Sequence, residues 1–135
     1  MTQPDNRTIV TTVFNALAEG QSKPLVDAMA DDFSWTLTGA SSWSRTFAGK
    51  EAVLGSLFKV LRERLDGRIK TRPRRIIAEG DMVVVEAQGD NVTLAGIPYR
   101  NSYCFVLRLA GGKLISLTEY CDTELAVRTL GEYPG

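Results

Sequence analysis

The sequence predicts a single α+β domain in which a curved antiparallel sheet and helices enclose a pocket for a small molecule. Apolar residues recur at helical spacing in the first half of the chain and alternate at strand spacing in the second half, with short turn-like stretches between the strands. Helices followed by closely connected strands are typical of the α+β class, and a bent sheet wrapped around a long helix leaves room for a pocket. The 135 residues, 44% of them hydrophobic, suffice for one domain.

Three helices are expected before the main part of the sheet. The first covers about residues 6–19 and stops at Gly20. The second is short, with Ser22 as its cap and Pro24 in its first turn. The third and longest covers about residues 50–65, where apolar side chains form one stripe: Val53, Leu57, Val60, Leu61 and Leu65.

Strands alternate in sequence with turn signals. They are expected at residues 33–38, 72–79, 82–88, 99–109 and 114–122. The Ser-rich segment 39–49 and the segment 89–98 are interpreted as connections. A last short helix is expected to start at Thr123 with Asp122 as its cap.

Composition excludes several classes of function. The 16 basic and 16 acidic residues cancel, so neither nucleic acid nor an anionic membrane is an expected partner. No apolar run approaches a membrane span, no secretory signal is visible and the two cysteines are too few for a disulfide scaffold, so we expect a cytoplasmic protein. The chain has no histidine, cysteine cluster or nucleotide-binding loop, so we expect neither a metal nor an organic cofactor.

One carboxyl group stands out as a candidate acid or base. Glu119 shares a predicted strand face with Ile115, Leu117 and Cys121, and a carboxylate among apolar neighbours is costly unless it is paired. It is either a catalytic proton acceptor or the partner of an arginine on a neighbouring strand. Its apolar surroundings should raise its pKa, and Glu86 should raise it further if the two carboxylates are close.

Several further side chains are candidate ligand contacts. Aromatic rings with hydrogen-bonding tips and polar groups on the same faces could line a pocket, although each could equally serve core packing or a surface ion pair. The candidates are Trp35, Trp43, Phe47, Glu86, Gln88, Tyr99, Asn101, Tyr103 and Cys121.

The order of segments across nearly the whole chain resembles the nuclear transport factor two-like superfamily, in its ketosteroid isomerase-like and SnoaL-like polyketide cyclase branch. The resemblance implies a cystatin-like, cone-shaped sheet around one long helix. The segments that carry it are ALAEG at 16–20, ADDFSW at 30–35, FAGKEAV at 47–53, AEGDMVVVE at 78–86, GIPYRNSY at 96–103, GKLI at 112–115 and EYCD at 119–122.

The catalytic groups that the resemblance implies are only partly present. The aspartate base of ketosteroid isomerases falls at Leu37, and their oxyanion donors fall near Val13 and Tyr103. The Asp-Arg-Asp group of limonene epoxide hydrolases falls near Glu86, Gln88 and Glu119, without the arginine. Neither mechanism therefore transfers unchanged.

Two functions remain open from the sequence. One is an isomerase, cyclase, dehydratase or hydrolase that acts on a small apolar molecule through Glu119. The other is a ligand-binding or dimeric interaction domain without catalysis. In either case we expect a homodimer through the outer sheet face, because that face includes apolar and aromatic residues that need covering and because the resemblance implies such a dimer. The residues on that face are Ser102, Val106, Thr118 and Tyr120, together with Arg100 and Arg108.

Overall fold

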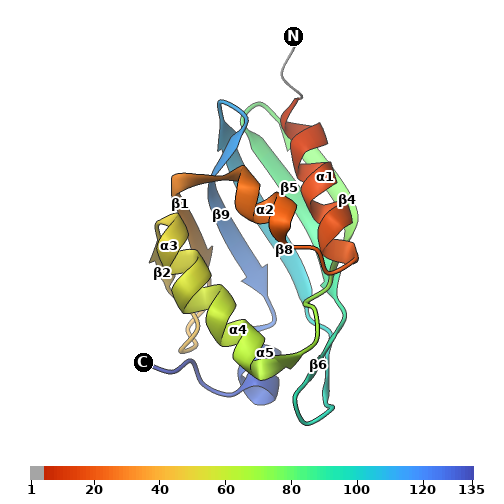
Figure 1. Cartoon of the computed structure of the whole chain (residues 1–135), viewed down its shortest axis with the longest axis vertical. Coiled ribbons are helices and arrows are strands. Elements are labelled where there is room, and N and C mark those ends of the chain that lie inside the picture. The colour runs from red at the N-terminus through yellow and green to blue at the C-terminus, as the bar shows by residue number, and fades with distance from the viewer. Residues whose placement is uncertain (1–4) are drawn as a thin grey trace.

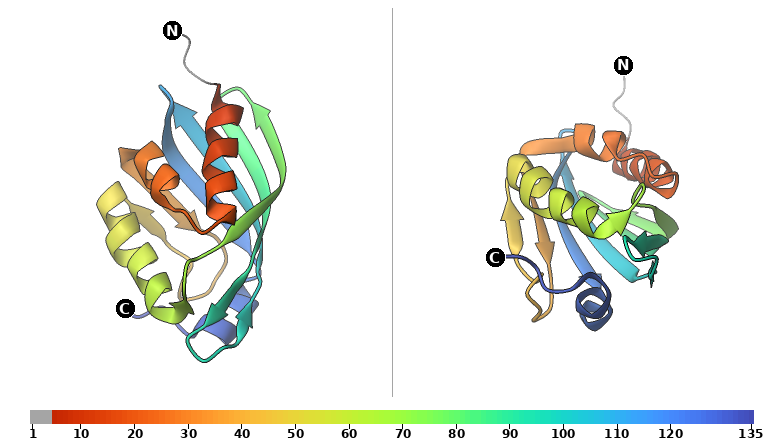
Figure 2. Two further views of the ribbon diagram at one scale, coloured as in Figure 1. Left: turned by 45° about the vertical axis from the view of Figure 1, so that its right-hand side comes forward. Right: turned by 60° about the horizontal axis from the view of Figure 1, so that its bottom comes forward.

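A six-stranded sheet curves around the helices on its concave side in the computed structural model, which describes residues 5–135 (Figures 1 and 2). The strand order is β2-β1-β9-β8-β5-β4. The strand bounds are β1 Met29–Leu37, β2 Thr46–Ala48, β4 Thr71–Glu79, β5 Met82–Gly89, β8 Ser102–Ala110 and β9 Lys113–Cys121. All neighbouring pairs are antiparallel except β1 and β9, which run parallel.

Helix α1 (Asn6–Ala18) packs over β4 and β5 and is followed by the short α2 (Lys23–Ala28). The carboxylate of Asp5 caps α1 by accepting a 2.8 Å hydrogen bond from the Thr8 amide. Ser22 lies at the cap position of α2, but its side chain makes no capping hydrogen bond, so that part of the prediction is wrong. Pro24 lies in the first turn of α2, as predicted.

The long helix runs as α3 (Lys50–Ala52), η1 (Val53–Phe58) and α4 (Lys59–Arg64). Its middle part is wider than an α-helix, since the Lys59 amide bonds the carbonyl of Leu54, five residues back. The helix crosses the concave side of the sheet, and the sheet curves around it (Figure 2). The prediction of a long helix over about residues 50–65 is confirmed.

A second, small sheet joins β3 (Leu65–Asp66), β6 (Asn91–Thr93) and β7 (Pro98–Tyr99). The sequence predicted connections at 39–49 and 89–98, and β2 and β6 lie inside them because strands of three residues carry too little alternation to recognise. The expected strand at 99–109 is interrupted at Arg100 and Asn101. The last helix, α5 (Thr123–Leu130), begins at Thr123 and is capped by Asp122, as predicted.

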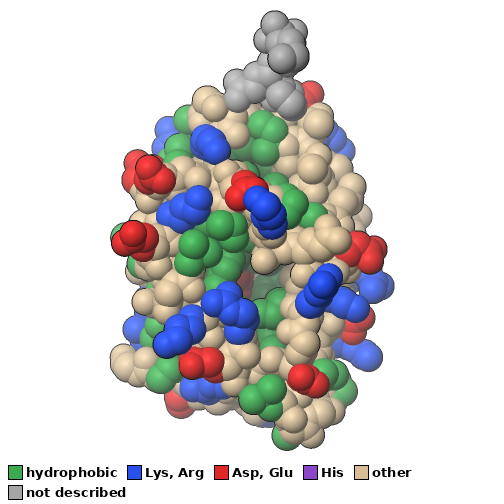
Figure 3. Space-filling view, in the orientation of Figure 1, with side chains coloured by type: hydrophobic (Ala, Val, Ile, Leu, Met, Phe, Trp, Pro, Cys, Tyr) green, Lys and Arg blue, Asp and Glu red, His purple; other side chains and the backbone are tan. Residues whose placement is uncertain are grey.

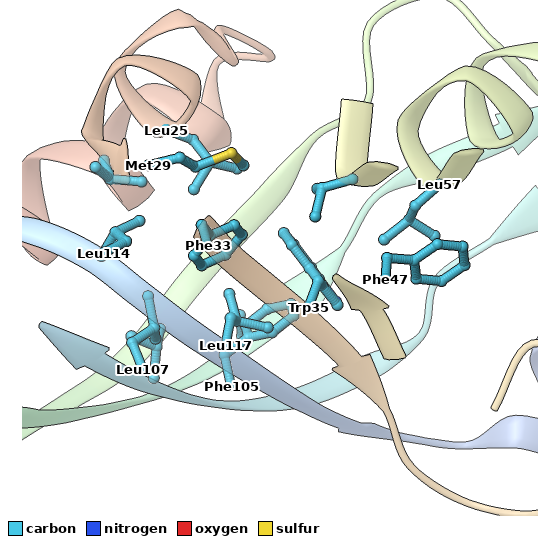
Figure 4. Close-up of a cluster of buried hydrophobic side chains, with 14 of the residues drawn as sticks. Leu25, Met29, Phe33, Trp35, Phe47, Leu57, Phe105, Leu107, Leu114 and Leu117 are labelled. Atoms are coloured by element: carbon cyan, nitrogen blue, oxygen red, sulfur yellow. The ribbon is translucent and has the colours of Figure 1, made fainter. Parts of the chain in front are cut away.

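The core lies between the concave sheet face and the helices (Figure 4). Residues of β5 and β8 alternate between the core and the outer face, but in β5 the odd-numbered residues Val83, Val85 and Ala87 lie inward, not the even-numbered face that carries Glu86 and Gln88. In β9 a register shift opposite Arg108 and Leu109 places Leu114 in the core, so Ile115 does not share the inward face of Glu119 as expected. Fully buried side chains at the centre include Phe14, Phe33, Leu57, Leu107, Leu114 and Leu117.

Within residues 5–135, no helix combines the length and the apolar character needed to cross a membrane.

Candidate functional site

A cavity of about 310 Å³ lies between the concave face of the sheet and the helices. This volume is in the range of sites for small organic ligands. Most of its wall is apolar. Its aromatic rings come from α1, β1, the loop after β1, the long helix and β8: Phe14, Trp35, Trp43, Phe58 and Phe105. Figure 3 shows a hollow lined with hydrophobic side chains on the face where α2 and α4 lie.

Glu119 lies in the wall of this cavity on β9, next to the parallel strand β1. Nε1 of Trp35 donates a 3.1 Å hydrogen bond to its Oε1. The backbone carbonyl of Glu119 accepts bonds from the amide and the hydroxyl of Thr38, at 3.1 and 3.0 Å. These contacts fix the residue at both its main chain and its side chain.

Burial raises the pKa of the Glu119 carboxyl to about 7 from its usual 4.5, because the charged form loses its hydration. Hydrogen bonds from Trp35 and from the thiol of Cys121 oppose this rise. Such a carboxyl group exchanges a proton readily at neutral pH, which is the property required of a general acid or base.

Glu119 is the one carboxyl group among the described residues that line the cavity. Glu86 lies outward and forms an exposed ion pair with Arg75, Nε to Oε1 at 3.1 Å. The expectation that Glu86 adds to the raised pKa of Glu119 is therefore wrong, since the two carboxylates lie on opposite faces of the sheet.

Tyr99 and Tyr103 also line the cavity, and Asn101 is fully buried behind Tyr99. Oδ1 of Asn101 accepts the backbone amide of Asp122 at 3.1 Å, so its Nδ2 is the donor to the Tyr99 hydroxyl oxygen at 3.0 Å. Because the Tyr99 oxygen accepts this bond, the bond does not use the hydroxyl proton of Tyr99.

Burial raises the pKa of Tyr99 to about 12 and raises that of Tyr103 well above 10. Burial and the neighbouring Glu119 raise the pKa of the Cys121 thiol to about 12. These three groups therefore stay protonated at neutral pH and act as donors rather than as bases or nucleophiles.

The remaining predicted contacts divide between the cavity wall and other places. Trp35, Trp43 and Cys121 line the cavity. Gln88 lies on the outer face, where its amide bonds Ser102 and the carbonyl of Asn101. Gln88 and Glu86 thus lie outside the cavity, because β5 directs its even-numbered residues away from the core.

Phe47 is buried but does not line the cavity. Its ring packs against Tyr133 of the C-terminal segment, with 5.7 Å between the ring centroids. Trp43 contacts the same ring and donates to the carbonyl of Gly131 at 2.8 Å. Of the three residues predicted to form a rim, Trp35 and Trp43 therefore line the cavity, whereas Phe47 packs against Tyr133 outside it.

Sequence analysis missed two arginines of the cavity. Arg62 on α4 and Arg68 after β3 both line it, although both residues are exposed. Nothing in the sequence separates them from other surface arginines, because their position depends on how α4 packs against the sheet. Within residues 5–135 no cluster of His, Cys, Asp and Glu side chains suited to a metal ion occurs.

The SnoaL-like domain family model matches residues 10–117. No curated protein matches the chain. Among solved structures, an NTF2-like protein of Burkholderia thailandensis E264 matches 94% of this chain and 98% of its own, with 18% identity and a TM-score of 0.81.

Two further solved structures are similar to this chain. A protein of Catenulispora acidiphila with a ketosteroid isomerase-like fold, in complex with trimethylamine, is 20% identical over 97% of this chain and 95% of its own, with a TM-score of 0.72. TerC, co-crystallised with polyporic acid, is 19% identical over 91% and 95%, with a TM-score of 0.75. These matches confirm the predicted fold, a curved sheet of the nuclear transport factor two-like type.

Proposed function

The chain belongs to the SnoaL-like domain family, and we propose that it is an enzyme that moves a proton on a small, largely apolar molecule by means of Glu119. The observation that carries this proposal is a buried carboxyl group with a pKa of about 7 in the wall of an apolar cavity. A carboxyl poised near neutral pH both accepts and returns a proton, and positioned proton transfer contributes about 10²–10⁴-fold in rate.

The reaction class that fits is isomerisation or ring closure next to a carbonyl group. The Glu119 carboxylate takes a proton from a carbon beside the carbonyl, so that the C–H bond breaks and an O–H bond forms on Glu119. The electron pair moves onto the carbonyl oxygen, where the Tyr99 hydroxyl, which stays protonated at neutral pH, donates to the developing negative charge. Where a C=C bond adjoins that carbon, the enolate is conjugated with it, and return of the proton from Glu119 to the far carbon of that bond shifts the double bond and completes an isomerisation without any co-reactant.

The character of the ligand follows from the cavity wall. Aromatic side chains such as Trp35, Phe58 and Phe105 favour a flat or bulky apolar molecule. The structural neighbours support a ligand-holding cavity, since one was co-crystallised with polyporic acid and another is a complex with trimethylamine.

A ligand-binding domain without catalysis is the second candidate. It is favoured by Leu37, which lies opposite Glu119 in the β1–β9 register and cannot take a proton. Among the described residues, the wall therefore has no second carboxyl group of the kind that many acid–base enzymes use.

Proton abstraction can be tested before the natural substrate is known. Ketones with acidic C–H groups, such as 2-tetralone, are incubated with the protein in D₂O, and deuterium uptake is followed by NMR. The wild-type protein should accelerate the exchange and Glu119→Gln should lose about 10²–10⁴-fold of that acceleration. Glu86→Gln removes a carboxylate from the outer face and should leave it unchanged.

The two candidate functions predict different results in this experiment. Quenching of tryptophan fluorescence measures ketone binding in the same samples, because Trp35 and Trp43, the two tryptophans of the chain, both line the cavity. Binding without exchange in both proteins favours the non-catalytic domain. Equal exchange in the wild-type protein and in Glu119→Gln contradicts the role of Glu119.

A further inference from the structure

Arg62 and Arg68 place two positive charges, both exposed to solvent, in the wall of a largely apolar cavity. Arg62 comes from α4 and Arg68 from the segment that leads into β4, so two separate parts of the chain supply them. Gly20 and Ser22, from the turn between α1 and α2, complete this part of the wall. Figure 3 shows Lys and Arg side chains around the hollow on this face.

Neither arginine is neutralised by the protein within residues 5–135. Arg62 and Arg68 form no ion pair there, whereas five other arginines pair with carboxylates: Arg72, Arg75, Arg100, Arg108 and Arg128. Glu63 and Asp66 are near Arg62 in sequence, yet no ion pair joins them to it. A guanidinium without a partner carboxylate is free to bind an oxyanion, frequently through two parallel hydrogen bonds.

Gly20 lies beside Arg68 and leaves space for its side chain. A Cβ atom on Gly20 would lie 2.7 Å from Cβ of Arg68, closer than two such carbons can approach. Gly20 also has a φ of +76°, a conformation that favours glycine. The glycine therefore lets the stem of Arg68 pack against the end of α1, while the α1 carbonyls of Ala16 and Leu17 are already bonded by backbone amides.

Arg62 and Arg68 are exposed residues of the cavity wall, whereas Glu119 is a buried residue of the same wall. The wall thus combines two solvent-exposed positive charges with a buried, proton-exchanging carboxyl group in a largely apolar lining.

We infer that Arg62 and Arg68 form an anion-binding rim, so that the ligand of this cavity is an organic anion with an apolar body and a carboxylate-type group at the opening. This inference rests on the proposed function, because it describes the outer end of the same ligand whose inner end meets Glu119. An anion held at the rim orients the body of the ligand and brings its reacting carbon to one place in the cavity.

A matched pair of fluorescent probes tests the rim without the natural ligand. The anionic probe is 8-anilinonaphthalene-1-sulfonate, and N-phenyl-1-naphthylamine is the same skeleton without the sulfonate. Binding is measured by probe emission together with quenching of Trp35 and Trp43, which reports occupancy of the cavity. The double variant R62Q/R68Q should lower the affinity for the anionic probe by about tenfold or more and the affinity for the neutral probe by less than about twofold.

The control variant is Arg108→Gln, which removes one positive charge from the outer face, where Arg108 pairs with Asp81. It should leave the binding of both probes unchanged. Equal effects of R62Q/R68Q on the two probes, or no effect on the anionic one, overturn the anion-binding rim and leave the cavity as a ligand site. If neither probe quenches the tryptophans of the wild-type protein, both the cavity function and the rim are contradicted.

Discussion

The indole nitrogen of Trp35 donates a 3.1 Å hydrogen bond to Oε1 of Glu119, which ties β1 to β9 inside the molecule. The two residues are 84 positions apart in sequence and meet because their strands run side by side. The bond gives the carboxylate a fixed orientation and partly replaces the water that burial removes. A carboxyl group with no such donor would be held neutral by its surroundings and could not act as a base near pH 7.

Replacing Trp35 with phenylalanine should raise the pKa of Glu119 above its value of about 7, because the lost hydrogen bond stabilised the charged form. Carbon-13 NMR titration of the glutamate side chains measures this shift. Trp43→Phe is the matched control, since it also loses an indole donor in the cavity wall but one that bonds Gly131. An unchanged or lowered pKa in Trp35→Phe would show that the indole does not stabilise the carboxylate.

Stability should depend on pH through Glu119. The pKa of this group is raised by folding, so the folded state holds the proton more tightly between about 4.5 and about 7. The stabilisation that this proton gives to the folded state is fully present below about pH 4.5. As the pH rises from about 4.5 to about 7, the free energy of unfolding falls by about 1.4 kcal/mol per pH unit, and above about pH 7 the stabilisation is lost.

Urea denaturation of the wild-type protein and of Glu119→Gln at pH 5 and pH 8 measures this dependence. The two proteins share their other titrating groups, so the difference between them isolates Glu119. From pH 5 to pH 8 the wild-type protein should lose about 2–3 kcal/mol relative to the variant. Parallel pH profiles would contradict a raised pKa in the folded state.

The sequence predicted the elements well and the inward face of each strand only in part. The apolar stripe of residues 50–65 and the alternation in 82–88 arise from burial on one side, so pattern alone reveals them. Glu86 and Glu119 stand in similar alternating segments, yet the first lies outside and the second inside. That difference depends on which face the helices cover, and no local pattern contains it.

Long-range packing determined the other features that the sequence did not reveal. Asn101 supports Tyr99 only because β9 brings Asp122 beside it, and Phe47 leaves the cavity because Tyr133 returns to pack on it. The rim of Arg62 and Arg68 requires the position of α4 over the sheet. Each of these is a contact between segments far apart in sequence, which periodicity cannot predict.

We propose that the outer face of β8 and β9 forms a twofold homodimer. Val106 and Thr118 are paired across these strands on that face, and Tyr120 beside them is 50% exposed. Tyr120→Lys should shift the protein from dimer to monomer in analytical ultracentrifugation. Leu94→Lys, at an exposed apolar residue between β6 and β7, should leave the mass unchanged. A wild-type protein that sediments as a monomer at every concentration would refute the dimer.

We expect Asn101 to contribute more to the free energy of unfolding than any other polar side chain near the cavity, because its side-chain amide forms three hydrogen bonds. Its Oδ1 accepts the Asp122 amide, and its Nδ2 donates to the Asp122 carbonyl at 2.9 Å and to the Tyr99 hydroxyl. Asp122 also caps α5, so the amide links the start of β8 to the last helix. Asn101→Ala should cost about 2–3 kcal/mol of unfolding free energy in urea denaturation, since it leaves part-buried backbone groups of Asp122 without their side-chain partner.

Two variants separate this linking role from the hydroxyl contact. Tyr99→Phe removes one hydroxyl and keeps both bonds between Asn101 and Asp122, so it should cost only about 1 kcal/mol. Asn101→Asp keeps an acceptor for the Asp122 amide but loses the donor to its carbonyl, so it should resemble Asn101→Ala more than Tyr99→Phe. If Asn101→Ala lowers the free energy of unfolding no more than Tyr99→Phe does, water replaces the amide at Asp122, and the link between β8 and α5 does not stabilise the fold.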